Sequence, residues 1–293
     1  MPVREMPARD DELTELSTGL VTLDLPVAPR ASRGRRLWNA TWPKLLATAI
    51  VFGIWQLVYW SGWKADYQIP SPSQTLQALF DNWHVVGPAT LRTLGRAAKG
   101  FTIALVVGTV VGALVARIPV LRTAVGSMIT GLQTMPSVVW FPAALLVFKL
   151  SETAILFVVV LGAAPSIANA LINGIDNIPP VLLRAGRVLG ASGLSTFRSV
   201  VLPAALPTFV GGLKQGWAFA WRSLLAGELL VLIAGKHSLG EQLEYNRQFA
   251  DAPGLFAVML VIFVIGVVMD ACVFSAAERW VRKRHGLISG TVA

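Results

Sequence analysis

Charged residues and cysteine are both scarce in this sequence of 293 residues. Asp, Glu, Lys and Arg make up 14% of the chain, whereas hydrophobic residues make up 54%. A water-soluble domain could not bury that much apolar surface in one core, so we expect a lipid bilayer to surround most of the chain. The single cysteine, Cys272, excludes an intrachain disulfide and is expected to pack as a small hydrophobic residue.

The sequence also lacks the motifs of common catalytic and cofactor-binding sites. Lys236 follows a glycine, but the second glycine and the Ser or Thr that would complete a nucleotide-binding loop are missing. His84, His237 and His285 are far apart, which argues against a metal or catalytic cluster. The net charge of +9 arises from bases beside apolar runs, so we do not expect nucleic acid as a partner. We therefore expect a chain that is not an enzyme and binds no metal or cofactor of its own.

Six apolar segments are long enough to cross a bilayer as helices. A hydrocarbon core about 30 Å thick requires about 20 apolar residues in a helix, since lipid offers the backbone no other hydrogen-bond partners. The third segment contains Pro136 and Pro142, which predict a kink or a break that lines a cavity. We therefore expect an all-α polytopic membrane protein with about six transmembrane helices. The segments are residues 45–63, 100–116, 125–148, 154–172, 209–234 and 254–277.

Basic residues predict the orientation of these spans. If the N-terminus is cytoplasmic, the inner segments contain the basic clusters around residues 30–44 and 279–284, whereas the outer segments contain only scattered bases. The positive-inside rule then places both termini in the cytoplasm. We expect a cytoplasmic tail over residues 1–40, a transmembrane domain over residues 41–285 and a second tail over residues 286–293.

One long polar segment, residues 173–207, falls on the predicted cytoplasmic side. Helix connections in bundles are usually short, so a segment of this length suggests a function. Two consecutive prolines, 179–180, can begin a short helix that Gly190 would end in a left-handed conformation. Ser195 gives a second start signal. We predict a helix, a sharp turn and another helix ending at Pro203, lying on the inner face of the membrane.

The same segment resembles the loop signature of bacterial ABC importer permeases. That signature reads Glu-Ala-Ala, three residues, Gly, nine residues, Ile, one residue, Leu-Pro, and the spacing from Arg184 to Pro203 agrees throughout. Arg184 replaces the usual Glu and Gly186 the second Ala, whereas the turn glycine, Gly190, is present. The resemblance covers about residues 55–285. Within the family, the sequence is most similar to the nitrate, sulfonate and taurine branch. Further matching positions are residues 69–72, 132–142 and 189–192, Trp221, Glu228, Leu239, Gly240, Arg247, Glu278 and Arg279.

The resemblance implies a type I ABC importer permease in the bacterial inner membrane. In this family the loop forms a coupling helix that docks in a groove of a separate ATPase subunit, which binds ATP and Mg. The expected partners are two ATPase subunits, a second copy of the permease, membrane lipid, and an extracytoplasmic binding protein that delivers a small anionic solute such as a sulfonate, taurine or nitrate. The candidate coupling residues are Arg184, Ala185, Gly186, Arg187, Leu189, Gly190, Ala191, Ser192 and Pro203.

The residues of this loop themselves suit docking into a groove. Apolar Leu183, Val188 and Leu189 are combined with cationic Arg184 and Arg187, as in an amphipathic helix that binds a partner. The alternative is an interfacial helix on anionic lipid headgroups. We favour docking, because a lipid-binding helix would not require the internal turn.

Ionisable residues within the predicted spans suggest a translocation pathway. Charges are costly in a bilayer and usually face a cavity or a partner. Arg222 and Glu228 are six residues apart, so they point to different faces of a helix and each should find a partner on another helix. For Arg222 we weigh a role in helping an anion to cross against a structural ion pair with Asp270. Pro136, Arg222 and Glu228 are the candidate pathway residues, and Lys214 lies near the inner end of the same span.

Small residues and an outer amphipathic segment complete the pattern. The repeats Gly108 with Gly112 and Gly212 with Gly216 should let helices pack closely within the subunit, the alternative being a dimer seam. The amphipathic stretch 73–83 predicts an outer helix, which either receives a binding protein or lies on the membrane surface.

Two other functions are less consistent with this sequence. A secondary transporter driven by an ion gradient would need paired broken helices and internal repeats, which we do not find. A membrane enzyme or an assembly factor is disfavoured because the predicted spans contain no catalytic cluster.

Overall fold

The computed structural model describes residues 33–65, 68–233 and 235–284, and the regular secondary structure in these ranges is helical. Of the predicted tail over residues 1–40, residues 1–32 lie outside the described residues, as do His285 and the predicted tail over residues 286–293. Residues 33–40 belong to a helix and not to a tail. The chain divides into two compact units, residues 1–53 with 290–293, and residues 54–289. In the first unit the described part is the beginning of α2, which starts at Arg33.

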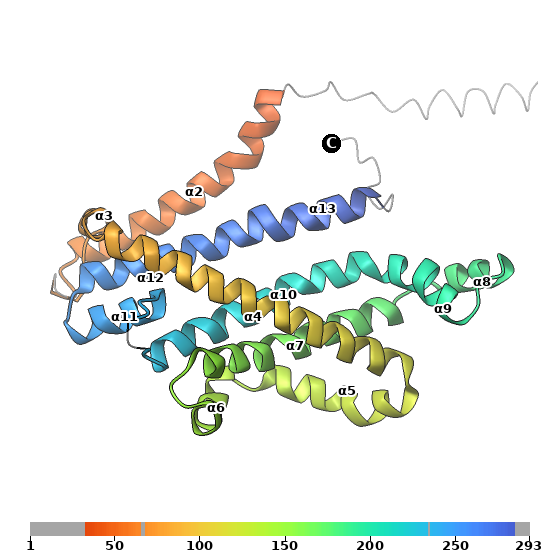
Figure 1. Ribbon diagram of the computed structural model, residues 1–293. Coiled ribbons are helices and arrows are strands. Elements are labelled where there is room, and N and C mark those ends of the chain that lie inside the picture. The colour runs from red at the N-terminus through yellow and green to blue at the C-terminus, as the bar shows by residue number, and fades with distance from the viewer. Residues whose placement is uncertain (1–32, 66–67, 234, 285–293) are drawn as a thin grey trace, which may run out of the picture. The chain divides into compact units, whose positions relative to one another are not determined.

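The order of helices is the following (Figure 1). They are α2 (Arg33–Trp60), α3 (Pro72–Asp81), α4 (Trp83–Arg117), α5 (Pro119–Thr134), the 3-10 helix η1 (Ser137–Trp140), α6 (Phe141–Phe148), α7 (Glu152–Asp176), α8 (Pro180–Val188), α9 (Gly193–Thr196), the π-helix η2 (Phe197–Val201), α10 (Leu202–Leu230), α11 (Leu239–Gln248), α12 (Ala252–Val268), the π-helix η3 (Met269–Phe274) and α13 (Ser275–Arg284).

Helix α7 is the centre of the second unit, and α4 and α10 pack along it (Figure 1). Its sequence is apolar on every side, as expected for a helix enclosed by other helices. Ile155, Val158, Val159 and Ile167 are fully buried within the main hydrophobic core. The long helices are therefore held together chiefly through contacts to α7.

Glycines allow α4 and α10 to approach α7 closely. A Cβ atom at Gly108 would lie 2.6 Å from the carbonyl oxygen of Ala164, and one at Gly112 would lie 2.8 Å from that of Ala168. The glycines at 212 and 216 in α10 approach α7 in the same way. The prediction that both glycine repeats pack helices within the subunit is confirmed.

The third predicted span is broken. Helix α5 ends at Thr134, Met135 and Pro136 are extended, and η1 with α6 leaves at an angle of 102°. A residue before proline is pushed out of the helical region, which explains why the break falls here. The predicted break at Pro136 is confirmed. Pro142 lies in the first turn of α6, where its missing N–H is tolerated.

Fewer than six helices of the described residues are both long enough and apolar enough to count as membrane spans. Within the described residues, four helical stretches qualify as membrane spans, or five if the bent pair counts as one. Helix α10 has 29 residues but contains three charged residues, so its role as a span remains a prediction. It ends at Leu230, before the predicted limit at residue 234, which lies outside the described residues.

The amphipathic stretch 73–83 is helical, as predicted, and belongs mainly to α3. Ser71 caps this helix, because its hydroxyl accepts a hydrogen bond from the backbone N–H of Gln74 at 3.2 Å. The Gln74 side chain in turn accepts the backbone N–H of Ser71 at 2.8 Å, which completes a capping box. The indole N–H of Trp55 donates to the carbonyl oxygen of Pro70 at 3.0 Å and ties the end of α2 to this segment.

We predict that Gly112→Ala destabilises the protein. The new methyl group would overlap the backbone of Ala168, and overpacking of this kind costs about 1–3 kcal/mol. Gly131→Ala in α5 is the matched control, since nothing lies within 4 Å of the added methyl group and alanine favours a helix by about 1 kcal/mol over glycine. Thermal unfolding of the detergent-purified variants measures both changes, and equal unfolding midpoints would contradict the close packing.

Candidate functional site

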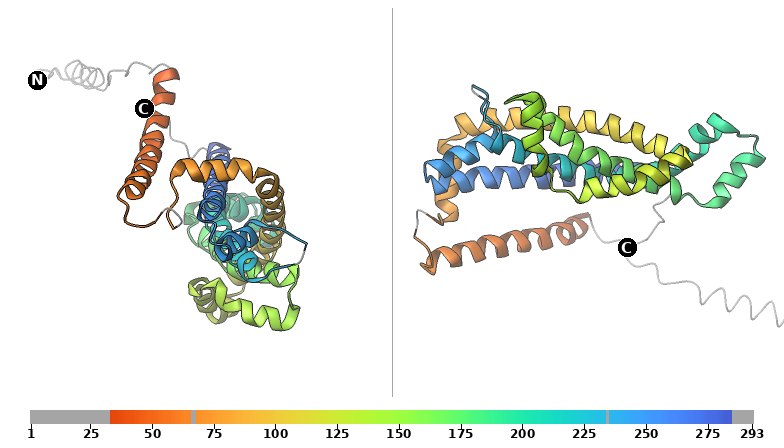
Figure 2. Two further views of the ribbon diagram at one scale, coloured as in Figure 1. Left: turned by 90° about the vertical axis from the view of Figure 1, so that its left-hand side faces the viewer. Right: turned by 90° about the horizontal axis from the view of Figure 1, so that it is seen from below.

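The polar segment is shorter than predicted and projects from the bundle. Residues 173–176 complete α7, and α10 already begins at Leu202, so the connection covers residues 177–201. Figures 1 and 2 show α8 and α9 extending beyond the ends of α5 and α7. The prediction that the second helix ends at Pro203 is wrong. Helix η2 continues directly into α10, and Pro203 lies in the first turn of α10. A force on this segment is therefore applied to α10 itself.

The predicted sharp turn is present at the end of α8. Gly190 has a left-handed φ of +83°, as predicted, and Gly193 has a φ of +53°. The backbone N–H of Ala191 donates to the carbonyl oxygen of Gly186 at 2.9 Å, and that of Gly190 donates to Arg187 at 3.0 Å. This is the hydrogen-bond pattern of a Schellman motif, which ends the helix in a fixed geometry.

Gly186 packs α8 against the helical turn that follows it. A Cβ atom at Gly186 would lie 2.8 Å from Cγ2 of Val200, so the two segments are as close as their side chains permit. The spacing between these two positions in the sequence signature thus corresponds to a direct contact. The contact and the Schellman motif together make the helix–turn–helix a rigid unit.

The outer surface of α8 combines apolar and cationic side chains. Val188 and Leu189 are 87% and 86% exposed, and Arg184 and Arg187 are exposed on the same short helix. Apolar side chains left this open at the tip of a projecting helix are typical of a surface that binds a partner. Of the other candidate coupling residues, Ala185 and Ser192 are exposed and Ala191 is half-buried.

A group of charges with a buried centre lies at the opposite ends of the long helices. We call it the Arg96 cluster, and its members are Arg96 of α4, Glu152 of α7, Glu228 of α10, Thr93 and Lys236. The Arg96 side chain donates to Glu152 at 2.9 Å and to Glu228 at 3.0 Å. Arg96 and Glu228 are only 2% and 1% exposed. One guanidinium group therefore connects three helices.

Glu228 also holds the start of α11. Its Oε2 atom accepts hydrogen bonds from the Thr93 hydroxyl at 2.8 Å and from the backbone N–H of Gly240 at 3.2 Å. The backbone N–H of Leu239 donates to the Thr93 hydroxyl at 3.0 Å. Lys236 donates to Glu152 at 3.1 Å and so adds the connection between α10 and α11 to the Arg96 cluster.

The sequence reasoning identified Glu228 but missed its partner. Arg96 lies just before the predicted span that begins at residue 100, whereas α4 extends from Trp83 to Arg117. The signal that could have revealed it is the spacing of Thr93 and Arg96, which are three residues apart and therefore share one face of a helix.

The candidate pathway residues are not brought together. Glu228 belongs to the Arg96 cluster, and Pro136 lies at the break after α5. The expected partner of Arg222 on another helix is not found among the described residues. Its Nε instead donates to the carbonyl oxygen of Ala218 in its own helix at 3.1 Å. Its guanidinium group also lies 5.0 Å from the ring centre of Phe219.

Of the two alternatives weighed for Arg222, the structural ion pair with Asp270 is not present. Asp270 instead lies 2.6 Å from the ammonium group of Lys214. Eight residues separate Lys214 from Arg222, which is about 12 Å along a helix axis. These three charged residues share a cavity of about 290 Å³, whose lining residues are Lys214, Trp217, Ala218, Trp221, Arg222, Gly266, Asp270 and Phe274.

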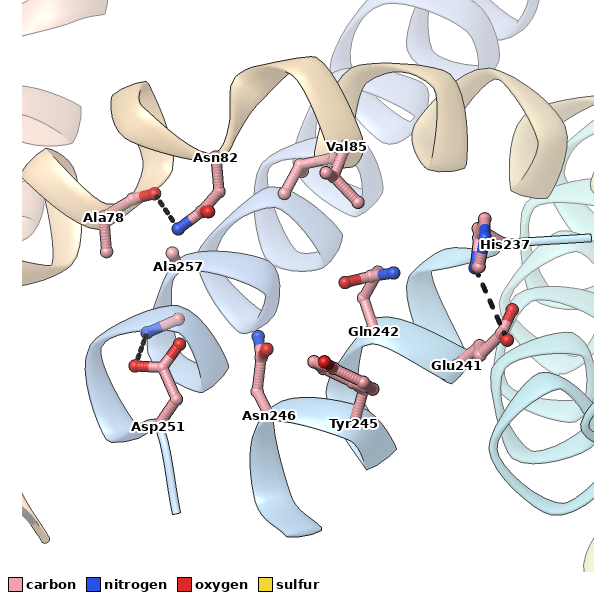
Figure 3. A pocket seen from close by; sticks show the side chains of 12 residues that line it. Ala78, Asn82, Val85, His237, Glu241, Gln242, Tyr245, Asn246, Asp251 and Ala257 are labelled. Carbon is pink, nitrogen blue, oxygen red and sulfur yellow. Dashed lines mark hydrogen bonds and ion pairs between the residues drawn. The ribbon is translucent and has the colours of Figure 1, made fainter. Parts of the chain in front are cut away.

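A larger polar cavity of about 550 Å³ lies between α3, α4, α11 and α12 (Figure 3). The side chains of Asn82, Gln242 and Asn246 face it, and Glu241 lies 3.6 Å from His237 at one side. Asp251 lies at the other side and caps α12 through the backbone N–H of Gly254 at 3.1 Å. This cavity is at the end of the unit opposite α8 and α9.

Arg247 occupies a position of the family pattern and pairs within α11. Its Nε donates to the carboxylate of Glu244 at 2.8 Å, and Gln248 donates to the same carboxylate. These hydrogen bonds lower the pKa of Glu244 to about 2. The pair therefore remains charged over the physiological pH range.

Solved structures identify the fold class. A chain of the inward-facing MetNI methionine ABC transporter matches 69% of this chain and 96% of its own length, with a TM-score of 0.56 and 21% identity. An amino acid ABC transporter with histidines matches 71% of this chain and 97% of its own, with a TM-score of 0.54 and 19% identity. The chain thus has the fold of a type I ABC importer permease.

The family follows from the sequence profile. Residues 104–283 match the profile of the binding-protein-dependent transport system inner membrane component, and the chain belongs to this family. It is 27% identical to a probable ABC transporter permease of Brucella melitensis, over 80% of this chain and 94% of the relative. It is also 27% identical to the nitrate import permease of Leptolyngbya laminosa, over 81% and 86%, and to a putative aliphatic sulfonates permease of Bacillus subtilis, over 84% and 88%.

We predict that Glu228→Gln destabilises the fold strongly. It leaves Arg96 buried without its full counter-charge, and breaking a buried ion pair costs about 3–5 kcal/mol. Glu278→Gln is the control, because the partly exposed Glu278–Arg282 pair of α13 should contribute only about 0–1 kcal/mol. Chemical unfolding of both variants tests the difference. If they lose equal stability, the Arg96 cluster does not hold the helices together.

Proposed function

We propose that this chain is the membrane-spanning subunit of an ATP-driven importer that takes up a small anionic solute of the nitrate or sulfonate type. The family assignment supports transport dependent on a binding protein. The relatives named as nitrate import and aliphatic sulfonates permeases support the solute class. The observation that carries the proposal is the projecting helix–turn–helix at residues 180–201, which continues into α10.

In this proposal α8 is the coupling helix. It docks through Val188, Leu189, Arg184 and Arg187 into a groove on an ATPase subunit, which binds ATP and Mg. Because Gly186 packs on Val200 and η2 is continuous with α10, closure of two ATPase subunits would move α10 without first deforming the loop. Two copies of the permease would form the passage between them.

The two ends of the helices then face opposite compartments. With α8 and α9 in the cytoplasm, both termini are cytoplasmic, and α3, α11 and the 550 Å³ cavity face the binding protein. Arg222, whose side chain is exposed and which has no acidic partner among the described residues, is proposed to attract the anion into the passage. Glu228 is proposed to hold the helices rather than to contact the solute.

We predict that Leu189→Glu abolishes binding of the ATPase subunit without unfolding the permease, because Leu189 is 86% exposed. The measurement is recovery of an ATPase when the tagged chain is purified from its native host. Phe249→Glu is the matched control, an exposed apolar residue just after α11 at the other end of the helices. Recovery of the ATPase with the Leu189 variant would contradict docking through α8. Solute uptake by this chain alone in ATP-free vesicles would contradict the importer as a whole.

We also predict that Arg222→Gln retains assembly with the ATPase and loses anion uptake. The substitution removes the exposed cation of the passage while keeping a polar, hydrogen-bonding side chain. Uptake of radiolabelled nitrate and an aliphatic sulfonate into proteoliposomes containing the complete transporter measures the loss. Arg282→Gln in α13 serves as the control for removal of an exposed arginine. Unchanged uptake kinetics in the Arg222 variant would remove this residue from the pathway.

A further inference from the structure

Lys214 and Asp270 form an ion pair in an unusual position for a membrane protein. Lys214 lies near the middle of α10, and Asp270 lies in η3, far from either end of the apolar stretch Ala252–Arg284. Their side chains are nevertheless 52% and 46% exposed on the surface of the chain. Charges at this depth are too costly to face lipid. The surface around them must therefore face an aqueous passage or another protein chain.

The walls around this pair are aromatic. Trp217 and Trp221 are stacked with ring centres 6.1 Å apart, and Phe274 lies 6.0 Å from Trp217. All three aromatic residues are largely buried, so they form fixed walls rather than mobile side chains. Apolar walls lower the local dielectric constant and strengthen every interaction between charges within the cavity.

A π-helical turn places the acid. Asp270 belongs to η3, the wide turn that interrupts α12 and α13. Such turns are energetically poor in isolation and are frequent at functional sites. A regular helix would rotate the following residues differently, so η3 sets which residue of this helix faces Lys214.

The charges of the cavity do not balance. Lys214 and Arg222 contribute two cations, whereas Asp270 is the one acid among the lining residues. The net charge of the cavity is therefore positive with the ion pair formed. A volume of about 290 Å³ admits a small oxyanion beside the pair.

We propose that Lys214 is an anion-binding residue halfway along the passage and that Asp270 is the built-in counter-ion that occupies it between transport events. The proposal rests on the proposed function and adds the site and the charge of the solute. A small monovalent oxyanion attracted by Arg222 displaces the Asp270 carboxylate from Lys214. When the anion leaves, Asp270 pairs with Lys214 again, which keeps the cation from holding the solute too tightly.

The two single variants should have opposite effects on anion affinity. Asp270→Asn removes the competing carboxylate, so binding should become about tenfold tighter, which corresponds to about 1.4 kcal/mol. Lys214→Gln removes the cation, so binding should become at least about tenfold weaker. If the pair were merely structural, both variants would lose stability and neither would bind the anion more tightly.

The test is isothermal titration of the full-length chain in nanodiscs with sodium nitrate and with sodium methanesulfonate. Sodium gluconate keeps the ionic strength constant. Lys99→Gln, at an exposed position of α4 outside the cavity, is the control and should leave affinity unchanged. Tighter binding by Asp270→Asn together with weaker binding by Lys214→Gln supports the proposal. Shifts in the same direction, or no binding of either anion by the wild-type chain, overturn it.

Two further measurements keep the result decisive. The double variant Lys214→Gln, Asp270→Asn removes both charges of the ion pair together, so neither is left without its counter-ion, and it should fold even if a single variant does not. Its affinity should be as low as that of Lys214→Gln, and wild-type affinity in the double variant would overturn the proposal. Co-purification of the ATPase, which involves the distant α8, is measured on the same variants. If the ATPase does not co-purify even with the wild-type chain, that result would count against the importer and not against the anion site.

Discussion

The buried guanidinium group of Arg96 is the constraint on which the rest of the architecture depends. It joins α4, α7 and α10 at one end of the bundle through two carboxylates, and Glu228 extends the connection to α11. Apolar contacts alone give membrane helices little preference for one rotation over another, because lipid is as apolar as the side chains. A charge that must be satisfied inside the bundle fixes the rotation of all three helices at once. The close approach of the glycines to α7 and the exposed face of α10 follow from that rotation.

The elements that depend on local sequence could be predicted. Pro136 breaks its helix and Gly190 ends α8 because each residue acts on its own backbone. The glycine repeats and the loop signature are likewise visible as spacings along the chain. The partners of the buried and cavity charges could not be predicted, because they depend on how far one helix is shifted and rotated against another. An ion pair of Asp270 with Arg222 was therefore one of two alternatives, whereas the partner of Asp270 is Lys214, about two helical turns away along α10.

Helix α10 connects the separate sites of the protein. Its first turn receives the helix–turn–helix, its middle carries Lys214 and Arg222, and its last turn carries Glu228. Such a helix cannot rotate freely at its far end, since Glu228 is held by Arg96, Thr93 and the backbone of α11. A displacement applied at the loop would therefore tilt α10 about that fixed end and move its middle relative to η3.

Because Gly186 and Val200 are in direct contact, a larger side chain at one position requires a smaller one at the other. The family signature has alanine where this chain has glycine, and the added methyl group would require Val200 to move outward. Val200 belongs to η2, and η2 runs directly into α10. One methyl group at this buried contact would therefore change how closely α8 packs on η2. If α8 docks on an ATPase subunit as proposed, an exchange of volume between these two positions would re-orient the docking helix with no change in the membrane-spanning part.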